Sequence, residues 1–74
     1  MFSENIHIGE MIRCELDRQG RKVAWFAKQI NSDKSNAYKI LKRDNIDLQL
    51  LICISKVLKH NFLEDCAHLI HTEI

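Results

Sequence analysis

The chain has 74 residues and a formal net charge of +1, and it is 46% hydrophobic and 28% charged. This balance predicts one globular domain and excludes a disordered tail. No apolar run approaches the roughly 20 residues of a membrane-spanning helix. The N-terminus M-F-S-E-N-I-H also lacks the basic start and apolar core of a secretory signal, so we expect a cytoplasmic protein with no membrane partner.

The absence of proline and the scarcity of alternating β-branched residues favour an all-α fold, a compact bundle of about five short helices. The first helix is predicted over Ile8–Gln19, with apolar residues on one face, and Gly20 is suited to a left-handed cap after it. The second is predicted over Val23–Ile30, where apolar residues follow the i, i+3, i+4, i+7 pattern. Trp25 lies at the edge of that pattern and is expected to pack against a neighbouring helix.

A polar turn follows the second helix and leads into a third, predicted over residues 33–42. Asn31 tolerates the left-handed backbone conformation better than most residues. Ser32 or Asp33 can then cap the third helix by accepting a backbone N–H. Two short helices joined by a tight turn, residues 22–42, predict a helix-turn-helix unit whose second helix enters the major groove of DNA.

The fourth helix, predicted over residues 47–59, is the most apolar segment. Asp47 is suited to its N-cap or first turn, and basic residues near its end complement the helix dipole. The last helix is predicted over Leu63–His71, with its apolar residues on one side.

Positive charge is concentrated in the expected helix-turn-helix unit. Residues 21–44 carry seven basic side chains and two acidic ones, whereas residues 1–20 and 45–74 each carry two basic and four acidic side chains. A phosphate-facing surface requires local positive charge, because affinity comes from the release of condensed counterions. The alternative is a solvated charged face without a function.

One face of the third helix is basic and polar, opposite the expected buried stripe of Ala37, Ile40 and Leu41. Every side chain on this face can donate a hydrogen bond, and the nearest acid is Asp33 in the first turn. The predicted contacts to DNA bases are Lys34, Ser35, Tyr38 and Lys39. The predicted contacts to the DNA backbone are Arg21, Lys22, Asn36, Lys42 and Arg43.

The cysteines Cys14, Cys53 and Cys66 form no C-x-x-C pair, and each lies in a predicted helix, where cysteine serves as a small apolar residue. We therefore expect free thiols rather than a disulfide framework. Cys66, His68 and His71 offer three potential metal ligands without a fourth at a recognisable spacing. Neither a metal site nor a cofactor is expected.

The segment F-A-K-Q-I-N-S-D-K-S-N-A-Y-K-I, followed by I-D-L-Q-L-L-I-C-I-S-K-V-L-K-H-N-F, resembles the Cro/repressor-type helix-turn-helix domain of the XRE family. Phe26-Ala27 is similar to the Leu-Ala of the family's second helix, and Ala37 and Ile40 match buried positions of its recognition helix. Leu50-Leu51, with Ile54 and Leu58, is similar to the apolar ladder of its fourth helix. The resemblance covers about residues 8–63.

This chain departs from the family at three points. Asn31 stands where the turn glycine is usual, and Val23 where many relatives carry a glutamine that touches the DNA backbone. The Glu-x-Gly signature after the recognition helix is absent, since the chain there is Leu41-Lys42-Arg43-Asp44. The expected backbone contacts therefore shift to Lys22 and Arg21.

The resemblance implies a lambda-repressor-like DNA-binding domain that occupies residues 1–74, with a core fold over 7–63 and a C-terminal helix over 64–74. It implies a sequence-specific, double-stranded DNA-binding transcriptional regulator, in particular a repressor, of a bacterium or a phage. Such a protein would be cytoplasmic and associated with the nucleoid. Such regulators usually act as homodimers on palindromic sites. The candidate dimer contacts are Phe62, Leu63, Leu69 and Ile70, for which covering the core is an equal alternative.

Two other functions remain open. One is an antitoxin-type autorepressor, with a toxin or another regulatory protein as its partner. The other is a helical protein-interaction module that does not bind DNA. An enzyme is not expected, because the chain has no nucleophile–base–acid set and no phosphate loop.

Overall fold

The computed structural model describes residues 7–73, and the side chains of residues 7–70. Within this part of the chain there are five helices and no strand, as predicted. The helices are α1 (Ile8–Gln19), α2 (Val23–Gln29), α3 (Lys34–Leu41), α4 (Leu48–Leu58) and α5 (Phe62–Glu73). None of these helices is both long and apolar enough to cross a membrane. Residues 1–6 and 74, which the expected domain includes, lie outside the described residues.

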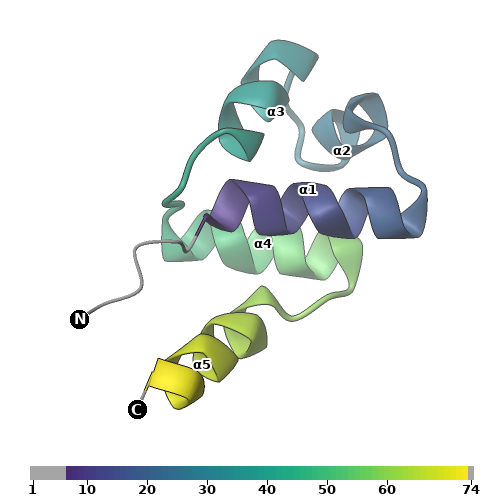
Figure 1. Cartoon of the computed structure of the whole chain (residues 1–74). Coiled ribbons are helices and arrows are strands. Elements are labelled where there is room, and N and C mark those ends of the chain that lie inside the picture. The colour runs from purple at the N-terminus through teal and green to yellow at the C-terminus, as the bar shows by residue number, and fades with distance from the viewer. Residues whose placement is uncertain (1–6, 74) are drawn as a thin grey trace.

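Helix α1 lies in the middle of the molecule (Figure 1). Helices α2 and α3 cover one side of it, α4 runs beside it in the same direction, and α5 lies on the side away from α2 and α3. Helices α1 and α4 therefore lie between the α2–α3 pair and α5.

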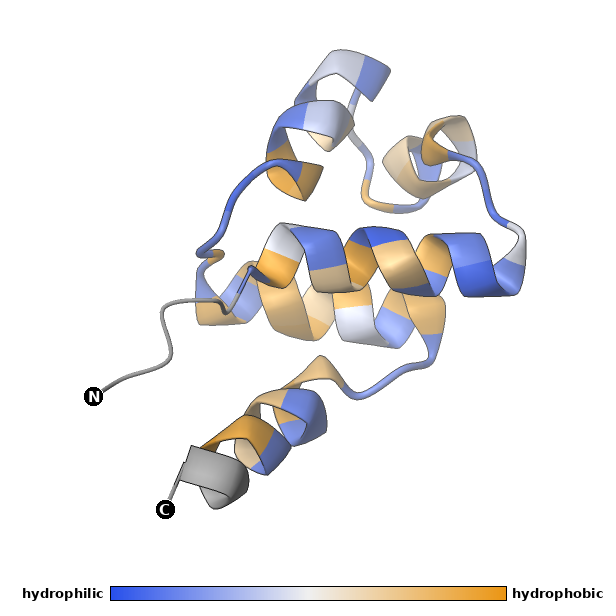
Figure 2. Ribbon diagram, in the orientation of Figure 1, coloured by the Kyte–Doolittle hydropathy of each residue, from blue (hydrophilic) through white to orange (hydrophobic). Residues whose placement is uncertain are grey.

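The core is formed by one apolar face of each helix. Figure 2 shows hydrophobic and hydrophilic residues interleaved along α1, as on a helix with one buried face. The buried apolar residues are Ile8, Ile12, Leu16, Phe26, Ala27, Ala37, Ile40, Leu41, Ile46, Leu51, Ile54, Leu58 and Phe62. Each large side chain of this set contributes about 1.5–3 kcal/mol through burial.

Phe62, expected among the dimer contacts, is only 1% exposed. It is the first residue of α5, and its ring fills the core beneath that helix. Of the two alternatives for Phe62, a dimer contact and a place in the core, the structure shows the second. Apolar spacing alone could not show which edge of the stripe faces inward.

Local signals in the sequence set several helix ends correctly. Gly20 has the left-handed φ of 70° after α1, and Asn31 has a φ of 60° in the turn after α2. The Asp33 carboxylate accepts the backbone N–H of Asn36 over 2.7 Å and caps α3. Asp47 caps α4 in the same way through Leu50 N–H, over 3.2 Å. Lys59 ends α4 with a φ of 53°, which its residue type did not indicate.

The start of α1 is bound to the chain that leaves α3. The backbone N–H groups of Ile8 and Gly9 donate to the carbonyl oxygens of Asp44 and Arg43, over 3.2 and 2.9 Å. A Cβ atom on Gly9 would lie 2.6 Å from the Arg43 oxygen and closer still to that of Leu41. Only glycine allows this approach without a shift of the backbone.

A polar network joins α1 to the end of α4 and the start of α5. The buried Glu15 carboxylate accepts hydrogen bonds from Arg18 and, over 2.7 Å, from Gln19 Nε2. The Gln19 amide also donates to the Leu58 carbonyl over 2.8 Å. His60 lies 3.7 Å from Glu15 Oε1, and its other ring nitrogen is 2.7 Å from Asp65 Oδ2.

This network changes the acidity of Glu15. The hydrogen bond from Arg18 is the main cause that lowers the pKa of Glu15 to about 2, and Gln19 and His60 act in the same direction. Burial opposes them by raising the pKa. Glu15 is therefore a carboxylate at neutral pH, held inside the fold by its hydrogen bonds.

The cysteine thiols are free, as expected. Cys14 and Cys53 are exposed, and Cys66 is half-buried. Burial, followed by the charge of Asp65, raises the pKa of the Cys66 thiol. The His71 side chain, considered above as a metal ligand, lies outside the described side chains.

Candidate nucleic-acid interface

The turn between α2 and α3 determines where α3 starts and how it packs against α2. The left-handed conformation of Asn31 reverses the chain, and Ser32 N–H closes the turn by donating to the Ala27 carbonyl over 2.9 Å. Ala27 and Ala37 are both buried, and their small side chains allow α2 and α3 to pack closely. Helix α3 thus begins directly at a tight turn, with Asp33 as its cap.

The outer face of α3 is available for binding. Its buried residues are Ala37, Ile40 and Leu41, as the helical wheel indicated. The four residues expected to contact bases are all exposed, namely Lys34, Ser35, Tyr38 and Lys39. Among the described residues, none of these four side chains forms a hydrogen bond or an ion pair with another residue. Their donors are free to bind an external ligand.

The residues expected to contact the DNA backbone are also exposed, but two of them have local partners. They are Arg21, Lys22, Asn36, Lys42 and Arg43. The Asn36 amide donates to Ser32 Oγ over 2.6 Å and thereby stabilises the turn. The Arg21 guanidinium lies 4.3 Å from the centre of the Trp25 ring, a cation–π contact. Trp25 itself packs against the core, as expected.

A depression of about 330 Å³ lies where α1, α2 and α3 meet. It brings together four of the expected DNA contacts, Arg21, Lys22, Lys34 and Tyr38. Ser35, Asn36, Lys39, Lys42 and Arg43 do not line it. Only one edge of the basic face of α3, the edge with Lys34 and Tyr38, therefore adjoins this depression.

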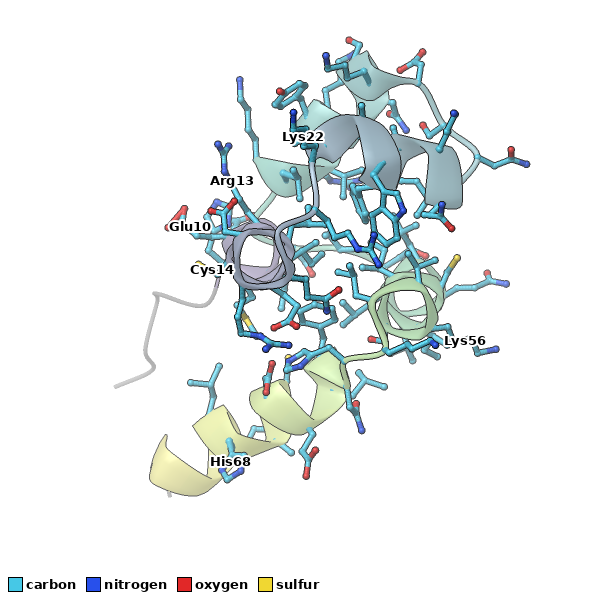
Figure 3. The ribbon with its side chains drawn as sticks, turned by 90° about the vertical axis from the view of Figure 1, so that its right-hand side faces the viewer. Glu10, Arg13, Cys14, Lys22, Lys56 and His68 are labelled. Carbon is cyan, nitrogen blue, oxygen red and sulfur yellow. The ribbon has the colours of Figure 1, made fainter. Side chains whose placement is uncertain are left out.

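Three α1 residues, Arg13, Leu16 and Asp17, also line this depression. Figure 3 shows Arg13, on α1, and Lys22, just before α2, on the same side of the molecule, with Lys56 on another side. The position of Arg13 beside these residues could not be predicted from the sequence, because Arg13 belongs to a segment with more acids than bases. Its closeness to Lys22 and Lys34 is a property of the tertiary structure alone.

A second hollow, of about 720 Å³, lies on a different face of α1, next to α5. Its lining mixes the apolar residues Met11 and Leu69 with several charged side chains. On α5, Leu63 is 41% exposed and Ile70 is 61% exposed. Two of the four expected dimer contacts are thus at the surface.

Comparisons with models of protein families, with curated proteins and with solved structures found no match for this chain.

Proposed function

We propose that the chain is a sequence-specific DNA-binding protein that inserts α3 into the major groove of double-stranded DNA and represses transcription. The observation that carries this proposal is the outer face of α3, where Lys34, Ser35, Tyr38 and Lys39 are exposed and make no internal polar contact in the described structure. An exposed helix selected for solubility alone would usually pair its bases with acids four residues away. This face has none.

The shape of α3 is compatible with the same proposal. A helix is about 10–12 Å across with its side chains, so it fits a major groove about 12 Å wide. Lys39 would donate to guanine O6 or N7, and Ser35 to several bases. Lys42 and Arg43 at the far end, with Lys22 before α2, would contact phosphates on the lips of the groove.

We further propose that the fold is of the lambda-repressor type found in the XRE family. The order and lengths of the helices support this, with α2 and α3 as a compact pair after a longer α1. One such module reads only a few base pairs, so the repressor would act as a homodimer on a palindromic site in the cytoplasm. The exposed Leu63 and Ile70 on α5 are the candidate contacts between the two copies.

Selection of bound sequences from a pool of random duplexes tests the function directly. The full chain is expected to enrich a palindromic consensus, with an affinity that falls steeply as salt rises. A pool without any enriched sequence at moderate salt would contradict the proposal. An affinity that does not respond to salt would contradict it as well, since each phosphate contact contributes about 0.9 to the log–log slope.

A protein-interaction module is the second candidate, and the hollow beside α5 with the exposed Leu63 and Ile70 favours it. An autorepressing antitoxin would combine both functions, with a toxin bound at this hollow. Sedimentation of the Leu63→Ser/Ile70→Ser variant separates the candidates. Loss of a dimer together with loss of cooperative DNA binding would support the repressor. Unchanged DNA binding by a monomer would mean that DNA binding does not need the dimer. No DNA binding by the unaltered chain would support the interaction module, which does not bind DNA.

A further inference from the structure

We propose that the depression between α1, α2 and α3 binds a backbone phosphate of DNA, and that Arg13 is a phosphate ligand there. This inference rests on the proposed function and extends its contact surface beyond the helix-turn-helix unit onto α1. The depression is lined by cations from three separate parts of the chain, Arg13 on α1, Arg21 and Lys22 before α2, and Lys34 on α3.

The two arginines of α1 differ in what their guanidinium groups contact. Arg18 is bound to the buried Glu15 carboxylate and so helps to hold the fold together. Arg13 is exposed and forms no hydrogen bond or ion pair with any other described residue. Its five N–H donors are therefore available for a planar, bidentate contact to phosphate oxygens.

The balance of charge within the depression favours an anion. Four cationic side chains line it, against the single acid Asp17, which makes no ion pair with them in the described structure. One of the four, Arg21, is held over the Trp25 ring, so Arg13, Lys22 and Lys34 have the most freedom to move onto a ligand. Tyr38 adds a hydroxyl donor at the edge.

The position of the depression fits a DNA strand that flanks the major groove. Lys34 and Tyr38 line it, whereas Ser35 and Lys39 of the same exposed face do not. With Ser35 and Lys39 directed at bases, the adjoining edge of α3 would face the sugar–phosphate backbone. Lys34 and Tyr38, predicted from the sequence as base contacts, would then contact the backbone instead. Arg13 would reach that backbone from the opposite wall of the depression, on α1.

Salt titrations with the full chain test the assignment. Dissociation constants for a random-sequence duplex are measured over a range of salt for the unaltered chain and for Arg13→Ala, Arg13→Lys and Lys56→Ala. Lys56 is the matched control, an exposed cation on α4 away from the depression. Arg13→Ala should weaken binding about tenfold at low salt and lower the log–log slope by about 0.9. Arg13→Lys should keep the slope, and Lys56→Ala should change neither quantity.

Arg13→Ala should also weaken binding to a selected site and to a scrambled site by the same factor, because a phosphate contact carries no base preference. Far-UV circular dichroism checks that the variant is folded, and Arg13→Gln repeats the test if it is not. Binding by the unaltered chain with the same slope in Arg13→Ala overturns the phosphate site and leaves the proposed function intact. An equal loss in Lys56→Ala also overturns the site, since it would reflect net charge alone. No binding by the unaltered chain overturns both proposals.

Discussion

The backbone N–H of Gly9 donates to the carbonyl oxygen of Arg43 over 2.9 Å. A Cβ atom at position 9 would lie 2.6 Å from that same oxygen, well inside van der Waals contact. The glycine thus allows the first turn of α1 to hold the chain that leaves α3. Arg43, a proposed phosphate contact, projects from backbone that is fixed by this bond.

Gly9→Ala should therefore lower the free energy of unfolding by about 3 kcal/mol, the upper part of the usual range for overpacking. Urea denaturation measures the change. Gly20→Ala is the control, because its left-handed φ of 70° is strained for alanine although no atom lies within 4 Å. It should cost only about 1 kcal/mol. Equal losses in the two variants would show that the contact with Arg43 is not tight.

Glu15→Gln should change how stability depends on pH. The pKa of Glu15 is lowered from 4.5 to about 2 in the folded protein. The carboxylate therefore makes its full contribution to stability at pH values above the pKa of the unfolded chain, 4.5. That contribution is lost as the pH falls through about 2. At pH 7 the variant should lose about 1–2 kcal/mol, a modest cost because the Arg18 partner is 69% exposed to solvent.

The difference between Glu15→Gln and the unaltered chain should narrow as the pH is lowered from about 5 to about 2. Thermal unfolding at several pH values measures it. Glu64→Gln removes an exposed carboxylate in the first turn of α5 and is the control for general charge effects. A gap that stays constant across this range would mean that Glu15 titrates normally in the folded protein.

Lys59→Gly should stabilise the protein by about 1 kcal/mol. Lys59 ends α4 with a φ of 53°, a conformation that costs a side-chain-bearing residue about 1–2 kcal/mol, and glycine adopts it freely. Lys59→Ala removes the same charge while keeping the Cβ atom, so it should give little gain. Chemical denaturation of both variants separates the backbone effect from the charge effect. Equal stabilities of Lys59→Gly and Lys59→Ala would contradict a backbone effect at this position.

Lys39→Ala should loosen base preference with little change in stability, because Lys39 is exposed and has no internal partner in the described structure. The expected loss is about 1–3 kcal/mol of discrimination at one base position. Competition between the selected site and its single-base variants measures this loss. Lys28→Ala, on exposed α2 surface, is the matched control. An unchanged base preference would show that Lys39 does not contact a base.

Periodicity and capping residues were enough to predict the five helices, because these signals are local. Asp33 and Asp47 accept backbone N–H groups within their own helices, and Asn31 turns left-handed where it was expected to. Where a helix face points is not a local property. For that reason the sequence left two alternatives for Phe62, a dimer contact and a place in the core, and the structure shows the second.

The candidate site was predictable where it lies on one helix and unpredictable where it spans several. A helical wheel drawn from the sequence is enough to identify the exposed residues of α3. The approach of Arg13 to Lys22 and Lys34 depends on how α1 packs against the α2–α3 pair. The burial of Glu15 depends likewise on distant partners such as His60, which no spacing in the sequence reveals.

The central position of α1 has a consequence for simultaneous binding. The depression between α1, α2 and α3 and the hollow beside α5 use different faces of this helix, and α5 lies away from the α2–α3 pair in both views (Figures 1 and 3). No residue lines both of them. The DNA contacts proposed above include none of the residues that line the hollow beside α5, so a protein bound there would cover a different set of side chains.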